Sequence, residues 1–147
     1  MIANQKNIQL SLASCKEVKF MLNVPTDSIK VNELKFGVLN RITPNLDKNL
    51  LVVDLGIQYT YLSTPIMECR YAFSFHYESE EGSMSVTKSD TGIQINNELL
   101  STIINIAAGA IRGIMIAKTA GTLLAEYPLP LLSTDLLMKN MVLVKND

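Results

Sequence analysis

Two neighbouring stretches of the sequence alternate strictly along the chain. At 53–61 and again at 67–77, large apolar residues occupy the odd positions and polar or small residues the even ones. A period of two is typical of a β-strand with one face in a core and one face in water. Weaker alternation over 8–22 and 34–42 predicts two more strands. The chain is therefore expected to build a half-buried antiparallel sheet.

Turn-forming residues separate these strands. The segments TPNLDKN at 43–49 and STP at 63–65 predict hairpin loops, so the last three strands should form a meander. The segment PTDS at 25–28 predicts a looser crossover between the first two strands. A length of 147 residues fits a single domain spanning 1–147.

The most apolar stretch of the chain, IINIAAGAIRGIMIAK at 103–118, predicts a long helix. Asn96 can cap its N-terminus, Lys118 suits its last turn, and Gly121 suits the position just after its end. Together with the strands, the fold class is predicted as α+β, a four-stranded antiparallel sheet with one long and one short helix.

The short helix is predicted over DLLMK at 135–139, with Ser133 or Thr134 as its cap. The polar segment 78–92 lies between the fourth strand and the long helix. It is interpreted either as a plain flexible connection or as a lid over a site.

The long helix carries a charge at its centre, Arg112. A charged residue in the middle of a membrane span costs at least about 3 kcal/mol, so membrane insertion is not expected. On a helical projection, a narrow strip of small and polar residues lies opposite a broad apolar face. We expect this strip to meet another subunit; its members are Ser101, Asn105, Ala108 and Arg112. The alternative is a monomer in which Arg112 reaches water.

Charge and motifs exclude several classes of function. The 13 basic and 14 acidic residues give a net charge of −1, so no nucleic-acid partner is expected. One histidine, His76, cannot build a histidine-rich metal site, and no phosphate-binding or nucleophile motif occurs. We therefore predict no catalytic residues, no metal, no cofactor and no enzymatic activity. Cys15 and Cys69 are interpreted as inert thiols of a reduced, cytoplasmic protein, with a regulatory pair left open.

Aromatic residues share one parity on neighbouring strands, and the extended segment YPLPLL at 127–132 is strongly apolar. Core packing explains most such residues, but those at the edge of the layer can line a groove. The predicted polypeptide-binding set is Phe36, Tyr61, Tyr71, Phe75, Tyr127, Leu129, Leu131 and Leu132.

The order of elements resembles the SecB family of export chaperones. The resemblance is carried by IRGIMIAKTAGTLLAEYPLPLLSTDLL at 111–137 and by IQLSLASCKEVKF at 8–20. It implies paired subunits with extended sheets, long helices between dimers of a tetramer, and ATP-independent holding of unfolded polypeptides. The tail MKNMVLVKND is short and not acidic, so docking to the translocase motor is doubtful. A solitary SecB-like chaperone that protects an antitoxin is a version of this prediction.

Two other hypotheses remain. The protein could be an adaptor or structural subunit of the same fold that binds one folded partner, which co-purification with a single stoichiometric protein would favour. It could also be a small-molecule binder or enzyme with a site under 78–92, which stabilisation by a metabolite would favour.

Overall fold

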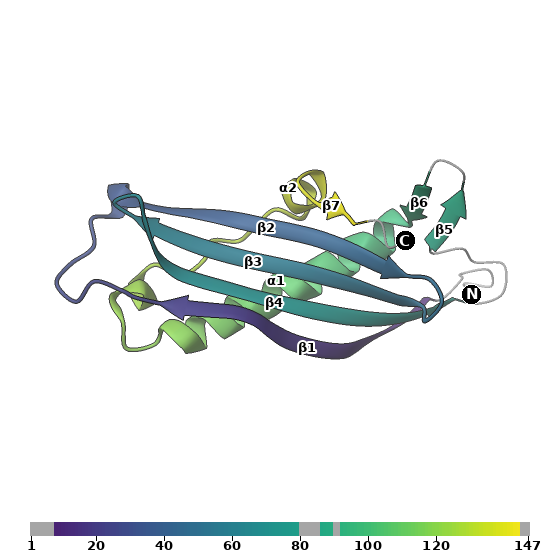
Figure 1. Cartoon of the computed structure of the whole chain (residues 1–147), viewed down its shortest axis with the longest axis horizontal. Coiled ribbons are helices and arrows are strands. Elements are labelled where there is room, and N and C mark those ends of the chain that lie inside the picture. The colour runs from purple at the N-terminus through teal and green to yellow at the C-terminus, as the bar shows by residue number, and fades with distance from the viewer. Residues whose placement is uncertain (1–7, 80–85, 90–91, 145–147) are drawn as a thin grey trace, which may run out of the picture.

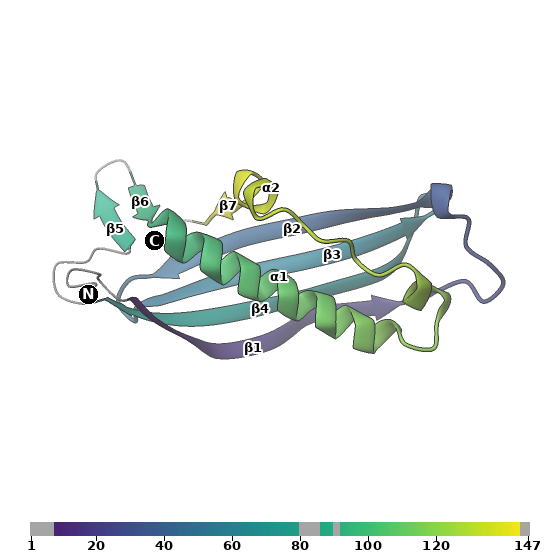
Figure 2. The ribbon, with the colours of Figure 1, turned by 180° about the vertical axis from the view of Figure 1, so that it is seen from behind.

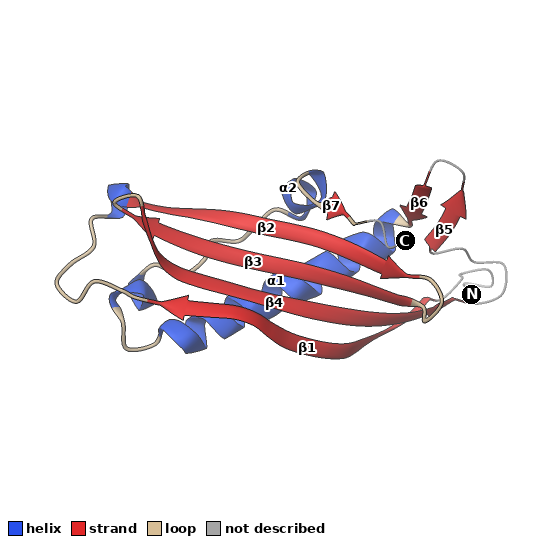
Figure 3. Ribbon diagram, viewed as in Figure 1, coloured by secondary structure: helices blue, strands red, loops and turns tan. Residues whose placement is uncertain are grey.

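The computed structural model describes residues 8–79, 86–89 and 92–144. Four long strands form one sheet, and the long helix α1 lies across one of its faces (Figures 1 and 3). In chain order, the elements are β1 (Ile8–Leu22), η1 (Val31–Glu33), β2 (Leu34–Asn45), β3 (Leu50–Tyr61), β4 (Thr64–Ser79), β5 (Val86–Ser89), β6 (Gly92–Ile95), α1 (Asn97–Thr119), η2 (Leu123–Glu126), α2 (Thr134–Lys139) and β7 (Val142–Leu143).

The strands lie in the order β1-β4-β3-β2-β7. The four long strands pair antiparallel, and β2, β3 and β4 form the predicted meander. The segment between β1 and β2 crosses from β1, at one edge of the sheet, past β4 and β3 to β2, as expected. The α+β class is thus confirmed.

The prediction of four strands in a purely antiparallel sheet was wrong in one respect. The two-residue strand β7 pairs parallel to β2, opposite Arg41 and Ile42. The backbone N–H of Val144 also donates to the carbonyl of Ile42 at 2.8 Å. A strand of two residues is too short to show a periodicity in the sequence. Its pairing depends on where α2, which comes just before it in the chain, lies in the fold.

The connection between β4 and α1 also holds structure that the sequence did not indicate. Strands β5 and β6 form a separate antiparallel hairpin of two four-residue strands. Residues 80–85 and 90–91 lie outside the described part of the chain, so the interpretation of this connection as a lid concerns mostly residues that are not described.

The core lies between α1 and the odd-numbered residues of β3 and β4. Val53 faces Phe73 across the two strands, and Leu51 faces Phe75, all of them essentially inaccessible to water. From the helix, Ile103, Ile104, Ala107 and Ile111 pack onto this layer. Burying so many large apolar side chains is the main source of stability, at roughly 25 cal/mol per Å² of apolar surface.

Strand β1 does not alternate simply between the two faces of the sheet along its whole length. Two bulges, between Leu12 and Ser14 and between Glu17 and Lys19, shift the register with β4. Between them Cys15 and Glu17 point to the helix side, and Val18 becomes half exposed. A bulge adds one residue and reverses which parity faces the core, and its position has no strong sequence signal.

Helix α1 has the predicted caps. The Asn96 side chain accepts hydrogen bonds from the N–H groups of Glu98 (2.8 Å) and Leu99 (3.3 Å), and Gly121 takes φ +82° just after the helix. Figure 2 shows α1 running diagonally over the sheet. By length and composition it also meets the criterion for a membrane span, but 44% of its most apolar window is buried within the chain.

The short helix α2 begins at the predicted cap, because Ser133 Oγ accepts from the N–H of Leu136 at 3.4 Å. Two side chains attach α2 to the rest of the fold. The buried Asn40 of β2 donates through Nδ2 to the carbonyl of Leu137 at 2.9 Å. The hydroxyl of Thr134 donates to Asn105 Oδ1 of α1.

Candidate functional site: an apolar groove beside the end of α1

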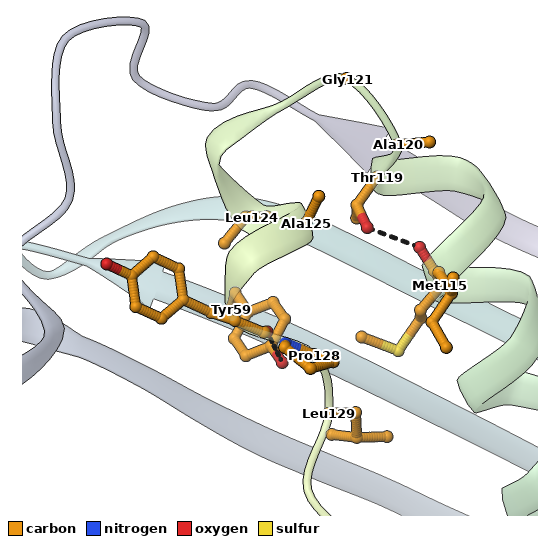
Figure 4. Close-up of a pocket in the computed structure, with 11 residues that line it drawn as sticks. Tyr59, Met115, Thr119, Ala120, Gly121, Leu124, Ala125, Pro128 and Leu129 are labelled. Carbon is orange, nitrogen blue, oxygen red and sulfur yellow. Dashed lines mark hydrogen bonds between the residues drawn. The ribbon is translucent and has the colours of Figure 1, made fainter.

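An apolar groove lies between the last turns of α1, the turn η2 and the extended segment that follows (Figure 4). Its volume is about 270 Å³. The sheet supplies one lining residue, Tyr59. The lining residues, which define the groove from here on, are Tyr59, Met115, Ile116, Thr119, Ala120, Gly121, Leu124, Ala125, Tyr127, Pro128 and Leu129.

Local chemistry builds the wall of this groove. The hydroxyl of Thr119 donates to the carbonyl of Met115 at 2.7 Å, so its polar atom is turned back onto the helix. Gly121 then reverses the chain, with a φ of +82° that other residues rarely adopt. Thr122 caps η2 by accepting from the N–H of Leu124 at 3.2 Å.

The extended segment forms the opposite wall. Pro128 and Pro130 favour extended backbone and prevent a further helical turn. The hydroxyl of Tyr59 donates to the carbonyl of Tyr127 at 3.0 Å, which fixes the segment to the sheet. Tyr127 itself reaches the carbonyl of Ile29 at 3.4 Å, so the segment also meets the β1–β2 crossover.

Apolar surface continues from the groove onto the neighbouring strand. Phe36 packs edge-on against Tyr59, with ring centroids 6.1 Å apart, yet 42% of Phe36 remains exposed. Val38 on the same strand and Leu131 in the extended segment are also exposed, Leu131 to 85%. Exposed apolar residues that adjoin a groove mark a binding surface more often than isolated ones do.

The predicted binding residues divide into two groups. Tyr127 and Leu129 line the groove, Phe36 adjoins it, and Leu131 and Leu132 lie in the segment just beyond. The other three are held inside the chain: Phe75 is 1% exposed in the core, while Tyr61 and Tyr71 are buried. In this arrangement Phe75 has no surface to offer a ligand.

The two buried tyrosines have internal roles. The Tyr61 hydroxyl accepts from the backbone N–H of Lys30 at 3.0 Å and so anchors the crossover. The Tyr71 hydroxyl donates to Glu17 Oε1 at 3.0 Å, and Lys118 of α1 lies 3.2 Å from the same oxygen. Burial and the Glu17 bond raise the pKa of Tyr71 to about 12, and the bond from Tyr71 lowers the pKa of Glu17.

Of the eleven residues that line the groove, the sequence analysis assigned only Tyr127 and Leu129 to a binding site. Tyr59 was assigned to a strand, and Met115 and Ile116 to the long helix, because nothing in the local pattern brings them together. The turn residues Gly121 and Thr122 were the available signal, since they show where the chain folds back beside the helix.

The groove has the chemistry of a hydrophobic binding site. Its lining residues include no Asp, Glu, Lys, Arg or His, and burial raises the pKa of Tyr59 above its ordinary value of 10. Its volume lies just below the range of about 300–1,000 Å³ usual for small-molecule pockets. Within the described ranges no cluster of His, Cys, Asp or Glu can hold a metal ion. Such a groove suits apolar side chains of a polypeptide.

The predicted interface strip on α1 is rotated from its expected position. Ala108 is buried within the chain, and Asn105 is bonded to Thr134 of α2. Ser101 and Arg112 are half-buried, and Arg112 Nε is buried without a hydrogen-bond partner among the described residues. The exposed line of the helix runs through Ile106, Gly109, Gly113 and Ile116.

Comparison with known proteins gives a match of structure and none of sequence. No protein-family model matches the sequence, and no curated protein matches it. The structure is similar to the Mycobacterium tuberculosis SecB-like chaperone Rv1957, solved in complex with a ChAD peptide from the HigA1 antitoxin Rv1956. The TM-score is 0.56 at 13% identity, covering 84% of this chain and 88% of that one. At this identity the likeness concerns the fold alone, and the chain has a SecB-like fold.

Proposed function

We propose that this protein is an ATP-independent holding chaperone that binds non-native polypeptides in the apolar groove and on the surface beside it. The observation that carries the proposal is the groove itself, walled by Met115, Leu124 and Pro128 and continued by the exposed Phe36. Burial of apolar side chains requires no particular sequence in the client, which suits a chaperone.

The fold supports the same function. The similar Mycobacterium tuberculosis protein is a chaperone that holds a peptide from an antitoxin. We infer by analogy that clients here include an extended segment of a partner such as an antitoxin. The alternative role within this proposal is to hold polypeptides before protein export.

We further propose that the working form is a homo-oligomer. Arg112 Nε is buried without a hydrogen-bond partner in the described chain, and a desolvated guanidinium is stabilised when it gains one. A Cβ added at Gly109 or Gly113 would meet no atom within 4 Å, so another helix can approach α1 closely there. Light scattering of the purified protein should give a multiple of 16.3 kDa, and Arg112→Glu should lower that mass.

Suppression of aggregation tests the chaperone function. An aggregation-prone protein is diluted from denaturant without ATP, with and without this chain, and turbidity is followed. Near-stoichiometric suppression is expected. Ile116→Glu puts a charge into the groove and should weaken suppression at least about threefold, since the charge must be desolvated when a client binds. Its mass by light scattering should equal that of the wild type, which separates the groove from a subunit contact.

Leu136→Glu is the matched control. Leu136 is 53% exposed and Ile116 is 56% exposed, but Leu136 lies on α2 and does not line the groove. It should suppress aggregation as the wild type does. Equal loss in both variants would contradict a groove-based function. No suppression by the wild type, with one stoichiometric protein co-purifying, would favour the adaptor hypothesis.

A further inference from the structure

The face of the sheet opposite α1 has a hollow near its centre. It lies where two glycines face outward, Gly37 on β2 and Gly56 on β3, and its volume is about 280 Å³. Leu39 and Arg70 stand on either side of Gly56 in one row across the sheet, and Gln58 and Glu68 continue the next row beside Gly37. The missing side chains make the hollow, and its size suits one apolar side chain.

Basic side chains outnumber carboxylates on this outer face, although the whole chain is slightly acidic. The strand registers place five basic side chains on it, against the carboxylates of Asp54, Glu68 and Glu78; the basic residues are Lys16, Lys19, Lys35, Arg41 and Arg70. The net charge of the face is thus positive, whereas that of the chain is −1. The remainder of the molecule is correspondingly acidic.

The carboxylates nearest the hollow are already neutralised. Asp54 accepts two hydrogen bonds from Arg70, at 2.6 and 2.9 Å, and one from Arg41 at 3.3 Å. Glu68 pairs with Lys19 at 2.8 Å. Lys16 and Lys35 form no ion pair with the described residues, and Lys35 is two positions from Gly37 on the same strand.

We propose that this outer face binds an acidic polypeptide segment of a partner protein, whose apolar side chain occupies the hollow between Gly37 and Gly56. Carboxylates that flank this side chain pair with Lys35 and with the exposed part of Arg41. The surface is separate from the apolar groove, since the two lie on opposite faces of the sheet. The occupant is a polypeptide and not a nucleic acid, because the hollow is sized for a side chain and the field is too weak to hold a phosphate backbone.

The test uses a fluorescein-labelled dodecapeptide with one central leucine between runs of aspartate and glutamate, titrated with the full-length protein and followed by anisotropy. A second peptide has alanine for leucine, and a third has lysine for every acidic residue. The leucine peptide should bind, the alanine peptide should bind several-fold more weakly, and the lysine peptide should not bind. Raising the salt concentration from about 0.05 to 0.5 M should weaken binding, because exposed charges are screened.

Two variants locate the site. Gly37→Phe fills the hollow from a position where a Cβ meets no atom within 4 Å, so the new side chain starts in open space. It should lower the affinity for the leucine peptide about tenfold, because the central leucine loses its binding position. Lys35→Glu should weaken it severalfold and reduce its salt dependence. Thr43→Phe, on the same face and strand, and Lys48→Glu, in the β2–β3 turn, are the matched controls and should bind normally.

Three results would overturn the proposal. One is equal binding of the leucine and lysine peptides, or no binding of either. Another is displacement of the leucine peptide by a single-stranded oligonucleotide of higher affinity, which would assign the face to nucleic acid. The third is a change of oligomeric mass in Gly37→Phe by light scattering, which would make the face a contact between copies of this chain. Aggregation suppression by Gly37→Phe should stay normal, which separates this surface from the chaperone groove.

Discussion

The two faces of the main sheet use the same strands for opposite purposes. On the face under α1, neighbouring strands pair Val53 with Phe73 and Leu55 with Tyr71, and the layer is sealed from water. On the outer face, Asp54 of β3 accepts hydrogen bonds from Arg70 of β4 and Arg41 of β2. The difference follows from the alternation of side chains along each strand: over 53–61 of β3 and 67–77 of β4, the apolar odd-numbered residues lie under α1, and the polar or small even-numbered ones lie on the other face.

The largest contrast between the faces is expected from two adjacent residues of β4. Phe73 is fully buried under α1, and Ser74 points outward. Phe73→Ala should lower the free energy of unfolding by about 3–5 kcal/mol, because it removes apolar contacts and leaves a cavity. Ser74→Ala should change it by less than about 0.5 kcal/mol. Urea unfolding at several protein concentrations measures both while separating any effect of oligomerisation. Similar values for the two variants would contradict the assignment of faces.

Asn40 is the exception on the covered face, a buried polar side chain among apolar ones. Its Nδ2 holds the carbonyl of Leu137 at 2.9 Å and so fixes α2. Asn40→Ala should cost about 1–3 kcal/mol, because that carbonyl loses its donor. In Asn40→Ala, amide hydrogen exchange in α2 should be faster than in the wild type, whereas exchange in β3 should change less.

Asn45→Ala on the same strand is its control. Asn45 accepts one exposed, long hydrogen bond from Lys48, at 3.3 Å, and its loss should cost only a few tenths of a kcal/mol. If Asn40→Ala left the exchange of α2 unchanged, then packing and not the amide would hold this helix.

Much of the covered face was predictable from sequence, and the groove was not. The period of two in β3 and β4 and the caps Asn96 and Ser133 are local signals, and the structure confirms them. The bulges of β1 and the pairing of β7 depend on neighbours far away in the chain, so local patterns are silent about them. The groove joins Tyr59 to Met115 and Tyr127, and only the tertiary fold brings these together.

The carboxylate of Asp54 on the outer face should make the free energy of unfolding depend on pH. Hydrogen bonds from Arg70 lower the pKa of Asp54 below its ordinary value of 3.8. The folded chain therefore binds fewer protons than the unfolded chain between the two pKa values. The stabilisation by Asp54 is complete above the ordinary value and is lost as the pH falls through the lowered one.

Asp54→Asn tests this inference by removing the carboxylate. It should cost about 1 kcal/mol at pH 7, since the network is partly exposed and bidentate. The difference in free energy of unfolding between the variant and the wild type should shrink as the pH is lowered from about 5 to 2. A difference that stays constant with pH would mean that Asp54 contributes through packing and not through its charge.

The smallest predicted effect has the opposite sign and joins the fold to the proposed outer site. Glycine weakens a strand interior, and Gly37 has ordinary extended backbone with open space beside it. Gly37→Thr should therefore raise the free energy of unfolding by about 0.5 kcal/mol, whereas Gly121→Ala, at φ +82°, should lower it. If Gly37→Thr stabilises the protein and also weakens the acidic leucine peptide, stability and binding have opposite requirements at this position. A gain in stability with unchanged binding would mean that the hollow does not bind the leucine side chain of the peptide.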